Sequence, residues 1–356
     1  MKLSEVDKTY KFVSADECSN LQVFDIQQAP FSIHGVFFEA GQYKRMPKMI
    51  AKSVSEGVDI LHTMTAGGRV KFRTNSQIVA LFVEEETYQI ANQALIGSSG
   101  FEIFADGKYV KSIFQPLDGK NLVKQKFSSY ARFTTKKWRE IEIYFPLYCR
   151  VFEVLVGIDE HALCSQSKDY KSGKPIVYYG SSITQGASAS KPSTAYQNFI
   201  ERWSHRDYIN LGFSGNCKGE QTMLDYIASL KMSAFVLDYD YNAETVEFLR
   251  RTHLNCYQTI REKHPKIPII MLSRPEANKT AESMERRDIV RATYEYAKAQ
   301  EDKNVYFMDG HTLFGKKDKD ICTIDGCHPT DLGFYRIAKR LYKVLKTAFE
   351  NKGEEI

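Results

Sequence analysis

The first half of the chain carries the pattern of a β-rich domain. Apolar and polar residues alternate in GGRVKFRTN, and packed apolar runs follow at residues 78–86 and 139–159. Gly and Asp turns such as Asp106-Gly107 separate these runs, and helical periodicity is scarce. Short strands divided by such turns predict an all-β, jelly-roll-like sandwich over residues 1–165.

A polar segment separates this region from the rest of the chain. Residues 161–174, HALCSQSKDYKSGK, are rich in lysine and serine, which is the composition of a linker. The total of 356 residues is also longer than one ordinary domain. We therefore expect a second domain over residues 166–356.

The second region alternates apolar runs with amphipathic helices. Between the first two runs, Tyr196, Phe199, Ile200 and Trp203 recur at the spacing of one helix face. Near-continuous apolar runs indicate strands that are covered on both faces, as in a parallel sheet. Five such units predict a three-layer αβα domain. The runs are PIVYYG, YINLGF, AFVLDY, IPIIMLS and VYFMDG, which begin at residues 175, 208, 234, 267 and 305.

Charge and composition exclude several classes of function. The chain has 49 Lys and Arg against 44 Asp and Glu and no long basic block, so nothing requires a nucleic-acid partner. No stretch approaches the roughly 20 apolar residues of a membrane span, and MKLSEVDKTYKF lacks the apolar run of a secretory signal. The seven cysteines include no CxxC pair, which fits reduced thiols. We expect a cytoplasmic protein that does not bind membranes, and the sequence leaves its oligomeric state open.

Candidate reactive groups follow the apolar runs, because ligands of open parallel sheets bind beyond the carboxyl ends of the strands. Ser182 stands at a strand-to-helix turn in GSSITQG, where it could be a nucleophile or only a helix cap. A nucleophilic serine needs a base, and the base needs an orienting partner. Asp325 and His328, in DGCHP, could supply both from one short loop, with His311 as the rival base.

The same strand ends offer donors for a developing oxyanion. The available groups are the backbone amides of Ser182 and Gly215 and the side-chain amide of Asn242. Asp238 and Asp240 could suggest a metal site, but strand alternation sends them to different faces and no His or Cys follows at ligand spacing. We therefore predict no metal and no cofactor.

Four ordered blocks give the chain a resemblance to the SGNH hydrolases, the GDSL-type esterases. The blocks stand here as GSSIT, NLGFSGN, DYDYNA and DGCHP, in the order of the family. The resemblance implies Ser182 as the nucleophile, His328 as the base and Asp325 as its orienter. It further implies Gly215 and Asn242 as oxyanion donors.

The resemblance covers residues 175–348 and has two departures from the family pattern. Ser181 stands where many members have Asp, and Tyr241 stands where the third block usually has Gly. In the first domain, SSGFEIF at residues 98–104 resembles the Gly-x-Asp-Leu-Tyr segment found ahead of such hydrolases. A sandwich before an SGNH domain resembles two-domain carbohydrate esterases.

The function implied is that of a serine esterase. It would remove O-acetyl groups from plant-type oligo- or polysaccharides, hemicellulose such as mannan or xylan, through an acyl-enzyme. Acetyl is favoured over long acyl chains because the sequence shows no amphipathic lid. The alternatives are an acylhydrolase for a non-carbohydrate ester, such as a lysophospholipid or thioester, and a non-catalytic carbohydrate-binding protein on a hydrolase scaffold.

Three further residues are candidates for contact with an acetylated oligosaccharide. Tyr179 and Tyr241 lie at strand ends, where aromatic rings could stack on sugars or pack beneath helices. Arg274 follows the fourth apolar run, where it could contact substrate or form a surface ion pair.

Overall fold

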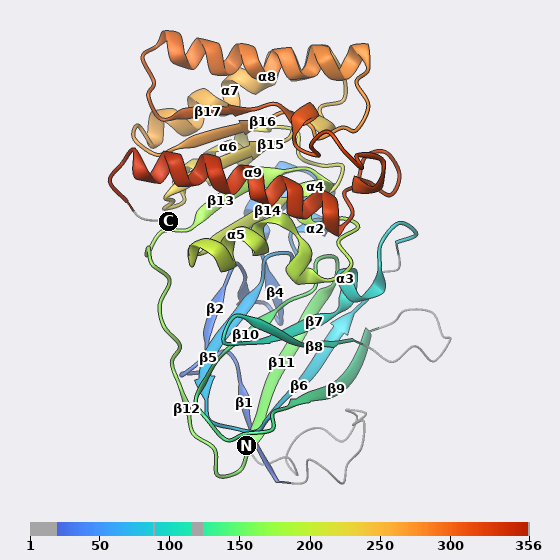
Figure 1. Ribbon diagram of the computed structural model, residues 1–356, viewed down its shortest axis with the longest axis vertical. Helices are drawn as coiled ribbons and strands as arrows, with labels where there is room; N and C mark the ends of the chain where they lie inside the picture. The colour runs from blue at the N-terminus through green and yellow to red at the C-terminus, as the bar shows by residue number, and fades with distance from the viewer. Residues whose placement is uncertain (1–19, 88–89, 115–123, 355–356) are drawn as a thin grey trace. The chain divides into compact units, whose positions relative to one another are not determined.

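Figure 1 shows a computed structural model of the chain, in which residues 20–87, 90–114 and 124–354 are described. Contacts between residues divide the chain into two compact units. The sandwich unit comprises the residues up to Arg45, Thr63–Asp169 and Ser190–Ser193, and the α/β unit comprises Met46–His62, Tyr170–Ala189 and Thr194–Ile356.

Two antiparallel sheets form the sandwich unit, as the alternating pattern predicted. The first sheet has the order β1 (Leu21–Asp25), β11 (Arg150–Asp159), β6 (Ile78–Glu86), β9 (Lys124–Arg132). The second has the order β12 (Cys164–Ser165), β5 (Arg69–Thr74), β10 (Arg139–Tyr144), β7 (Phe101–Ala105), β8 (Lys108–Ile113), with β2 (Ser32–His34) also beside β5. A hairpin of β3 (Phe37–Glu39) and β4 (Gln42–Lys44) and the short helix α3 (Leu95–Ser99) complete the unit.

The core of this unit lies between the sheets. Val79, Leu81 and Val83 on β6 join Phe72 and Ile141 of the opposite sheet in one buried cluster. The alternate residues of β6, Ile78, Ala80 and Phe82, pack in a second cluster with residues of β1 and β11. Side chains on a strand alternate between its faces, so the nearly continuous apolar run of β6 serves both clusters.

Segment Ser190–Ser193 belongs to the sandwich unit although it follows the second domain's first strand in the sequence. Glu102, within the predicted SSGFEIF segment, is fully buried. Its carboxylate accepts a 2.9 Å hydrogen bond from Ser193 Oγ and lies 3.3 Å from Lys191 Nζ. A buried carboxylate needs such partners, which explains why this short segment is held here.

The α/β unit confirms the predicted three-layer domain. Its parallel sheet has the order β14 (Tyr208–Gly212), β13 (Ile176–Gly180), β15 (Ala234–Asp238), β16 (Ile269–Leu272), β17 (Val305–Met308). On one face, α5 (Tyr196–Ser204) packs against α9 (Asp331–Glu350); on the other lie α6 (Gln221–Ser229), α7 (Val246–Lys263) and α8 (Ala281–Ala299) (Figure 1). No helix in the described residues is long and apolar enough to span a membrane.

Two helices within the predicted β domain pack with the α/β unit instead. Helices α1 (Lys48–Val54) and α2 (Glu56–Leu61) lie in Met46–His62, and α1 contacts α6. A Cβ on Gly57 of α2 would come within 1.9 Å of Asn216 Oδ1, so α2 lies directly against the loop after β14. The division between the units is therefore less simple than the single boundary near residue 165 that the sequence predicts.

Candidate active site

The Ser182 turn is built by close packing at the end of β13. Strand β13 ends at Gly180, and helix α4 (Ser182–Gln185) begins at once. A Cβ on Gly180 would lie 2.1 Å from Thr184 Oγ1, so only glycine lets the helix fold back onto the strand. Gly212 has the same role on β14, because its Cβ would lie 2.2 Å from the Gln185 nitrogen. These contacts hold Ser182 at the carboxyl edge of the sheet.

Ser181, which stands where many family members have Asp, caps the start of helix α4. It is the N-cap of α4, and its side chain accepts a 3.2 Å hydrogen bond from the Ile183 amide. Serine and aspartate are both good N-cap residues. The substitution therefore keeps the start of the helix, and with it the position of Ser182.

A chain of hydrogen bonds connects Ser182 to the predicted histidine and aspartate. Ser182 Oγ lies 2.9 Å from His328 Nε2, and His328 Nδ1 lies 2.7 Å from Asp325 Oδ2. The other oxygen of Asp325 accepts hydrogen bonds from the backbone amides of Cys327 at 3.0 Å and His328 at 2.7 Å. Asp325 thus fixes both the fold of its loop and the orientation of the imidazole. This arrangement can transfer a proton from the serine hydroxyl to the histidine.

The rival base, His311, lies elsewhere in the unit. Its Nε2 is 3.0 Å from Ser283 Oγ, and its side chain is almost fully buried. Burial is the main cause that lowers the pKa of His311, against the opposing charge of Asp309. The structure therefore places His328, and not His311, beside Ser182.

Gly215 and Asn242, the predicted oxyanion donors, lie in two loops that a hydrogen bond connects. Gly215 has φ of +70° and is exposed, and the neighbouring Ser214 amide donates to Gln185 Oε1 at 3.0 Å, which joins this loop to α4. Asn242 Oδ1 accepts a 3.3 Å hydrogen bond from the Cys217 amide. Within the described residues, neither the Gly215 N–H nor Asn242 Nδ2 has a protein acceptor. Their role as oxyanion donors stays a prediction.

Tyr241 connects the loops around Asn242. Its hydroxyl donates to the Pro275 carbonyl at 3.0 Å, and the Arg274 guanidinium lies 5.1 Å from its ring centroid. The Tyr241 hydroxyl thus joins the loop of Asn242 to the loop that follows β16. Arg274 is itself paired with Glu276 at 2.8 Å. Both side chains are partly exposed, and their contact with substrate stays a prediction.

Tyr179 has a different position from the one its strand end suggested. The side chain is fully buried, its ring stacks on Tyr239, and its hydroxyl accepts a 3.0 Å hydrogen bond from the Gly219 amide. Both faces of a parallel sheet are covered, so a strand residue has no exposed side. The structure gives Tyr179 a packing role in place of the predicted substrate contact.

Two buried aspartates form hydrogen bonds with segments that carry candidate site residues. Asp238 accepts a 2.9 Å hydrogen bond from Thr184 Oγ1, and burial raises its pKa to about 8. Asp240 accepts a 2.8 Å hydrogen bond from the Arg274 amide, and burial raises its pKa to about 6. Asp238 therefore holds helix α4, and Asp240 holds the loop that follows β16. In the part of the chain that the structure describes, no group of three or more His, Cys, Asp or Glu side chains could hold a metal ion.

Comparison with known families decides the relationship that these blocks suggest. Residues 173–346 match the model of the GDSL-like lipase/acylhydrolase family, and residues 21–163 match a model of the N-terminus of SGNH-hydrolase-type esterases named GxDLY. Residues 173–346 thus form a GDSL-like lipase/acylhydrolase domain. The resemblance that the four blocks indicate is confirmed, and the SSGFEIF segment lies within the second match. Together with the esterase match of residues 21–163, this domain makes the protein a carboxylic ester hydrolase.

Solved structures show the same fold. A GDSL-like lipase candidate from Bacteroides ovatus is 26% identical, with a TM-score of 0.82, covering 93% of this chain and 98% of its own. The salicylyl-acyltransferase SsfX3 of a tetracycline biosynthetic pathway is 17% identical, with a TM-score of 0.76 and coverage of 94% and 98%. An acetyl xylan esterase from Butyrivibrio proteoclasticus is 13% identical, with a TM-score of 0.57 and coverage of 92% and 99%. No curated protein matches the chain.

Several features of the site could not be read from the four blocks. Helix α2, whose Gly57 contacts Asn216, supports the loop that carries Gly215. The hydrogen bond from Tyr241 to the Pro275 carbonyl is likewise a tertiary contact. The one local signal for α2 is Ser55, which caps that helix by accepting a 3.2 Å hydrogen bond from the Val58 amide.

Proposed function

We propose that this GDSL-like esterase removes acetyl groups from the hydroxyls of a plant-type oligo- or polysaccharide. The observation that carries the proposal is the hydrogen-bonded series of Ser182, His328 and Asp325, with distances of 2.9 and 2.7 Å. A serine in such contact with an oriented imidazole can attack an ester carbonyl. We assign these three residues the roles of nucleophile, base and orienter.

The reaction would proceed through an acyl-enzyme. His328 Nε2 accepts the proton as Ser182 Oγ attacks the carbonyl, and the Asp325 carboxylate stabilises the imidazolium. The amides of Ser182 and Gly215 and the side chain of Asn242 stabilise the oxyanion. His328 then donates its proton to the departing sugar hydroxyl. His328 then accepts a proton from water as the water attacks the acetyl-serine. The C–O bond to Ser182 breaks, acetate leaves, and His328 returns the proton to Ser182 Oγ.

A carbohydrate substrate is supported by the arrangement of the chain. A β-sandwich unit accompanies the α/β unit, and the acetyl xylan esterase of similar fold acts, by its name, on an acetylated hemicellulose. The partly exposed Tyr241 and Arg274 offer an aromatic ring and a cation near Asn242. Aromatic rings suit the apolar faces of sugars. We therefore favour acetylated oligosaccharides over lysophospholipids and thioesters.

The test compares substrates on the full chain. Acetylated xylo- and manno-oligosaccharides are incubated with the wild-type protein and with Ser182→Ala, and mass spectrometry follows the loss of acetyl groups. A long-chain lysophospholipid and an acyl thioester are assayed in parallel. We expect acetyl loss with the wild-type protein alone. Faster cleavage of the lysophospholipid or thioester would contradict the carbohydrate substrate while leaving the serine mechanism standing.

A further inference from the structure

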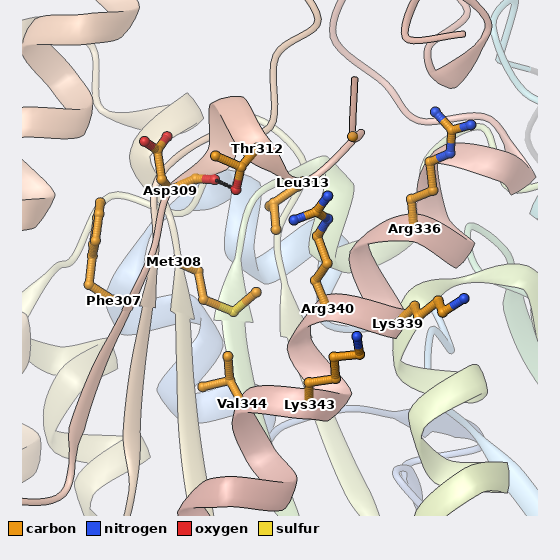
Figure 2. A pocket seen from close by; sticks show the side chains of 11 residues that line it. Phe307, Met308, Asp309, Thr312, Leu313, Arg336, Lys339, Arg340, Lys343 and Val344 are labelled. Atoms are coloured by element: carbon orange, nitrogen blue, oxygen red, sulfur yellow. Dashed lines mark hydrogen bonds between the residues drawn. The ribbon is translucent and has the colours of Figure 1, made fainter. Parts of the chain in front are cut away.

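A cavity of about 580 Å³ lies between the end of the edge strand β17 and helix α9 (Figure 2). Its volume is within the range of small-molecule sites. The lining combines apolar side chains with a group of cations on one helix. The apolar residues include Met308, Leu313 and Val344, and the cations are Arg336, Lys339, Arg340 and Lys343.

The cations of α9 lie next to other cations along the helix. Arg336 and Arg340 are four residues apart, as are Lys339 and Lys343, so each pair lies on neighbouring turns. The helix carries acidic residues only at its ends, Asp331 and Glu350. Like-charge pairs at this spacing destabilise a helix. A bound anion would remove that penalty.

Three of these cations have no counter-ion among the residues that the structure describes. Among the described residues, no carboxylate pairs with Lys339, Arg340 or Lys343, and all three side chains are exposed. Figure 2 shows Arg340 and Lys343 extending from adjacent turns of α9, with Leu313, Met308 and Val344 labelled around the same space. The cavity thus offers a guanidinium and an ammonium group beside an apolar surface.

The remaining charged groups of the cavity are already engaged. Arg336 Nη1 donates to the Lys317 carbonyl at 2.7 Å, so this guanidinium anchors the neighbouring loop. Asp309, the acid that lines the cavity, lies 3.9 Å from Arg287 and 3.8 Å from Arg291, both outside it. Its charge is therefore balanced by other cations, and the cavity keeps an excess of positive charge.

We propose that this cavity binds the phosphomonoester group of an organic molecule. A phosphate dianion matches several cations at once, and a guanidinium presents two parallel N–H donors to its oxygens. Arg340 and Lys343 bind the phosphate, Lys339 adds charge, and Met308 and Val344 contact the apolar part of the ligand. None of these residues belongs to the Ser182 site, so the proposal is independent of the proposed esterase function.

Calorimetric titration of the full chain with phenyl phosphate at low ionic strength tests the site. We expect saturable binding that Arg340→Gln and Lys343→Gln each weaken by about tenfold or more, because each removes one charge-assisted contact. Lys346→Gln is the matched control: it removes one positive charge from the exposed face of the same helix, and Lys346 does not line the cavity. Its affinity should equal that of the wild-type protein. Inorganic phosphate should bind more weakly than phenyl phosphate because it lacks the apolar contact.

A vesicle arm distinguishes a soluble phosphate from a lipid headgroup. The protein is sedimented with phosphatidylcholine vesicles that contain phosphatidate. If the wild-type protein and Lys346→Gln sediment with the vesicles and Arg340→Gln does not, the phosphate group that binds the cavity comes from a lipid. The proposal is overturned if neither phenyl phosphate nor phosphatidate binds, or if Lys346→Gln weakens binding as much as Arg340→Gln. Far-UV circular dichroism and unchanged hydrolysis of an aryl acetate confirm that each variant is folded.

Discussion

Ser182 and His328 share one hydrogen bond, yet the structure holds them by opposite means. The Ser182 turn is buried and allows no added atom at Gly180 or Gly212. The loop of His328 is partly exposed, and around Gly326 it has open space. The backbone bonds of Asp325 keep its shape. Packing of the whole sheet edge thus places the nucleophile, while a local turn places the base.

The comparison predicts that the two regions respond differently to substitution. Changes in the packing around the Ser182 turn should reduce both the free energy of unfolding and the activity, because they move buried backbone. Changes in the Asp325–His328 loop should reduce activity with a smaller loss of stability, because its side chains are partly exposed.

The largest expected effect is the loss of activity in Ser182→Ala and His328→Ala. Each should lower kcat on an aryl acetate by about 10³-fold or more, because the attack loses its nucleophile or its base. His311→Ala is the control, since His311 bonds with Ser283 and not with Ser182. Initial rates and urea unfolding curves measure the two properties. Equal loss of activity in His311→Ala and His328→Ala would remove the distinction between the two histidines.

Asn242→Ala should have the next largest effect. Loss of one oxyanion donor lowers kcat by about 10² to 10³ with little change in KM. The substitution also removes the 3.3 Å bond to the Cys217 amide, so a small loss of stability should accompany it. Steady-state kinetics on an aryl acetate provide the measurement. A kcat close to that of the wild-type protein would exclude Asn242 from the site.

Two glycine substitutions compare the regions directly. Gly212→Ala places a Cβ 2.2 Å from the Gln185 nitrogen, and overpacking of this kind costs about 1–3 kcal/mol of unfolding free energy. Gly326→Ala meets no atom within 4 Å, and its cost is only the strain of φ at +83°, about 1 kcal/mol. Urea unfolding of both variants measures the difference. A greater loss in Gly326→Ala would reverse the comparison.

The last expected effect is a pH dependence of stability that arises from Asp238, whose carboxylate bonds with Thr184 of the Ser182 helix. Burial raises the pKa of Asp238 from 3.8 to about 8, so between these values the folded state holds a proton that the unfolded chain has released. The contribution of Asp238 to stability therefore falls as pH rises through this window. Asp238→Asn should lose less stability than the wild-type protein between about pH 4 and 8. The free energy of unfolding in urea is measured against pH for both proteins. Parallel plots would show that Asp238 does not titrate as described.

The sequence predicted the parts of the molecule that depend on local pattern. The five buried strands show as continuous apolar runs, and Asp325 and His328 come from one short motif whose bonds are local. Contacts between distant segments were missed. Helices α1 and α2 follow a β hairpin in sequence but pack with the α/β unit, and nothing in residues 46–62 specifies that partner.

Tyr179 shows why position along a strand does not predict exposure. It lies one residue before Gly180, at the end of β13 where ligands bind, but its ring stacks on Tyr239 in the core. The bonds of Glu102 to segment Ser190–Ser193 join residues about ninety positions apart. Such pairings depend on the folded arrangement of both sheets, which a single sequence does not display.

Acid quenching during turnover of a small aryl acetate tests the central claim most directly. Intact-protein mass spectrometry should find the added mass of one acetyl group per chain, and peptide mapping should place it on Ser182. The adduct should be absent from Ser182→Ala and strongly reduced in His328→Ala, because both are required to form the acyl-enzyme. An acetyl group on another residue, with Ser182→Ala still fully active, would contradict the account.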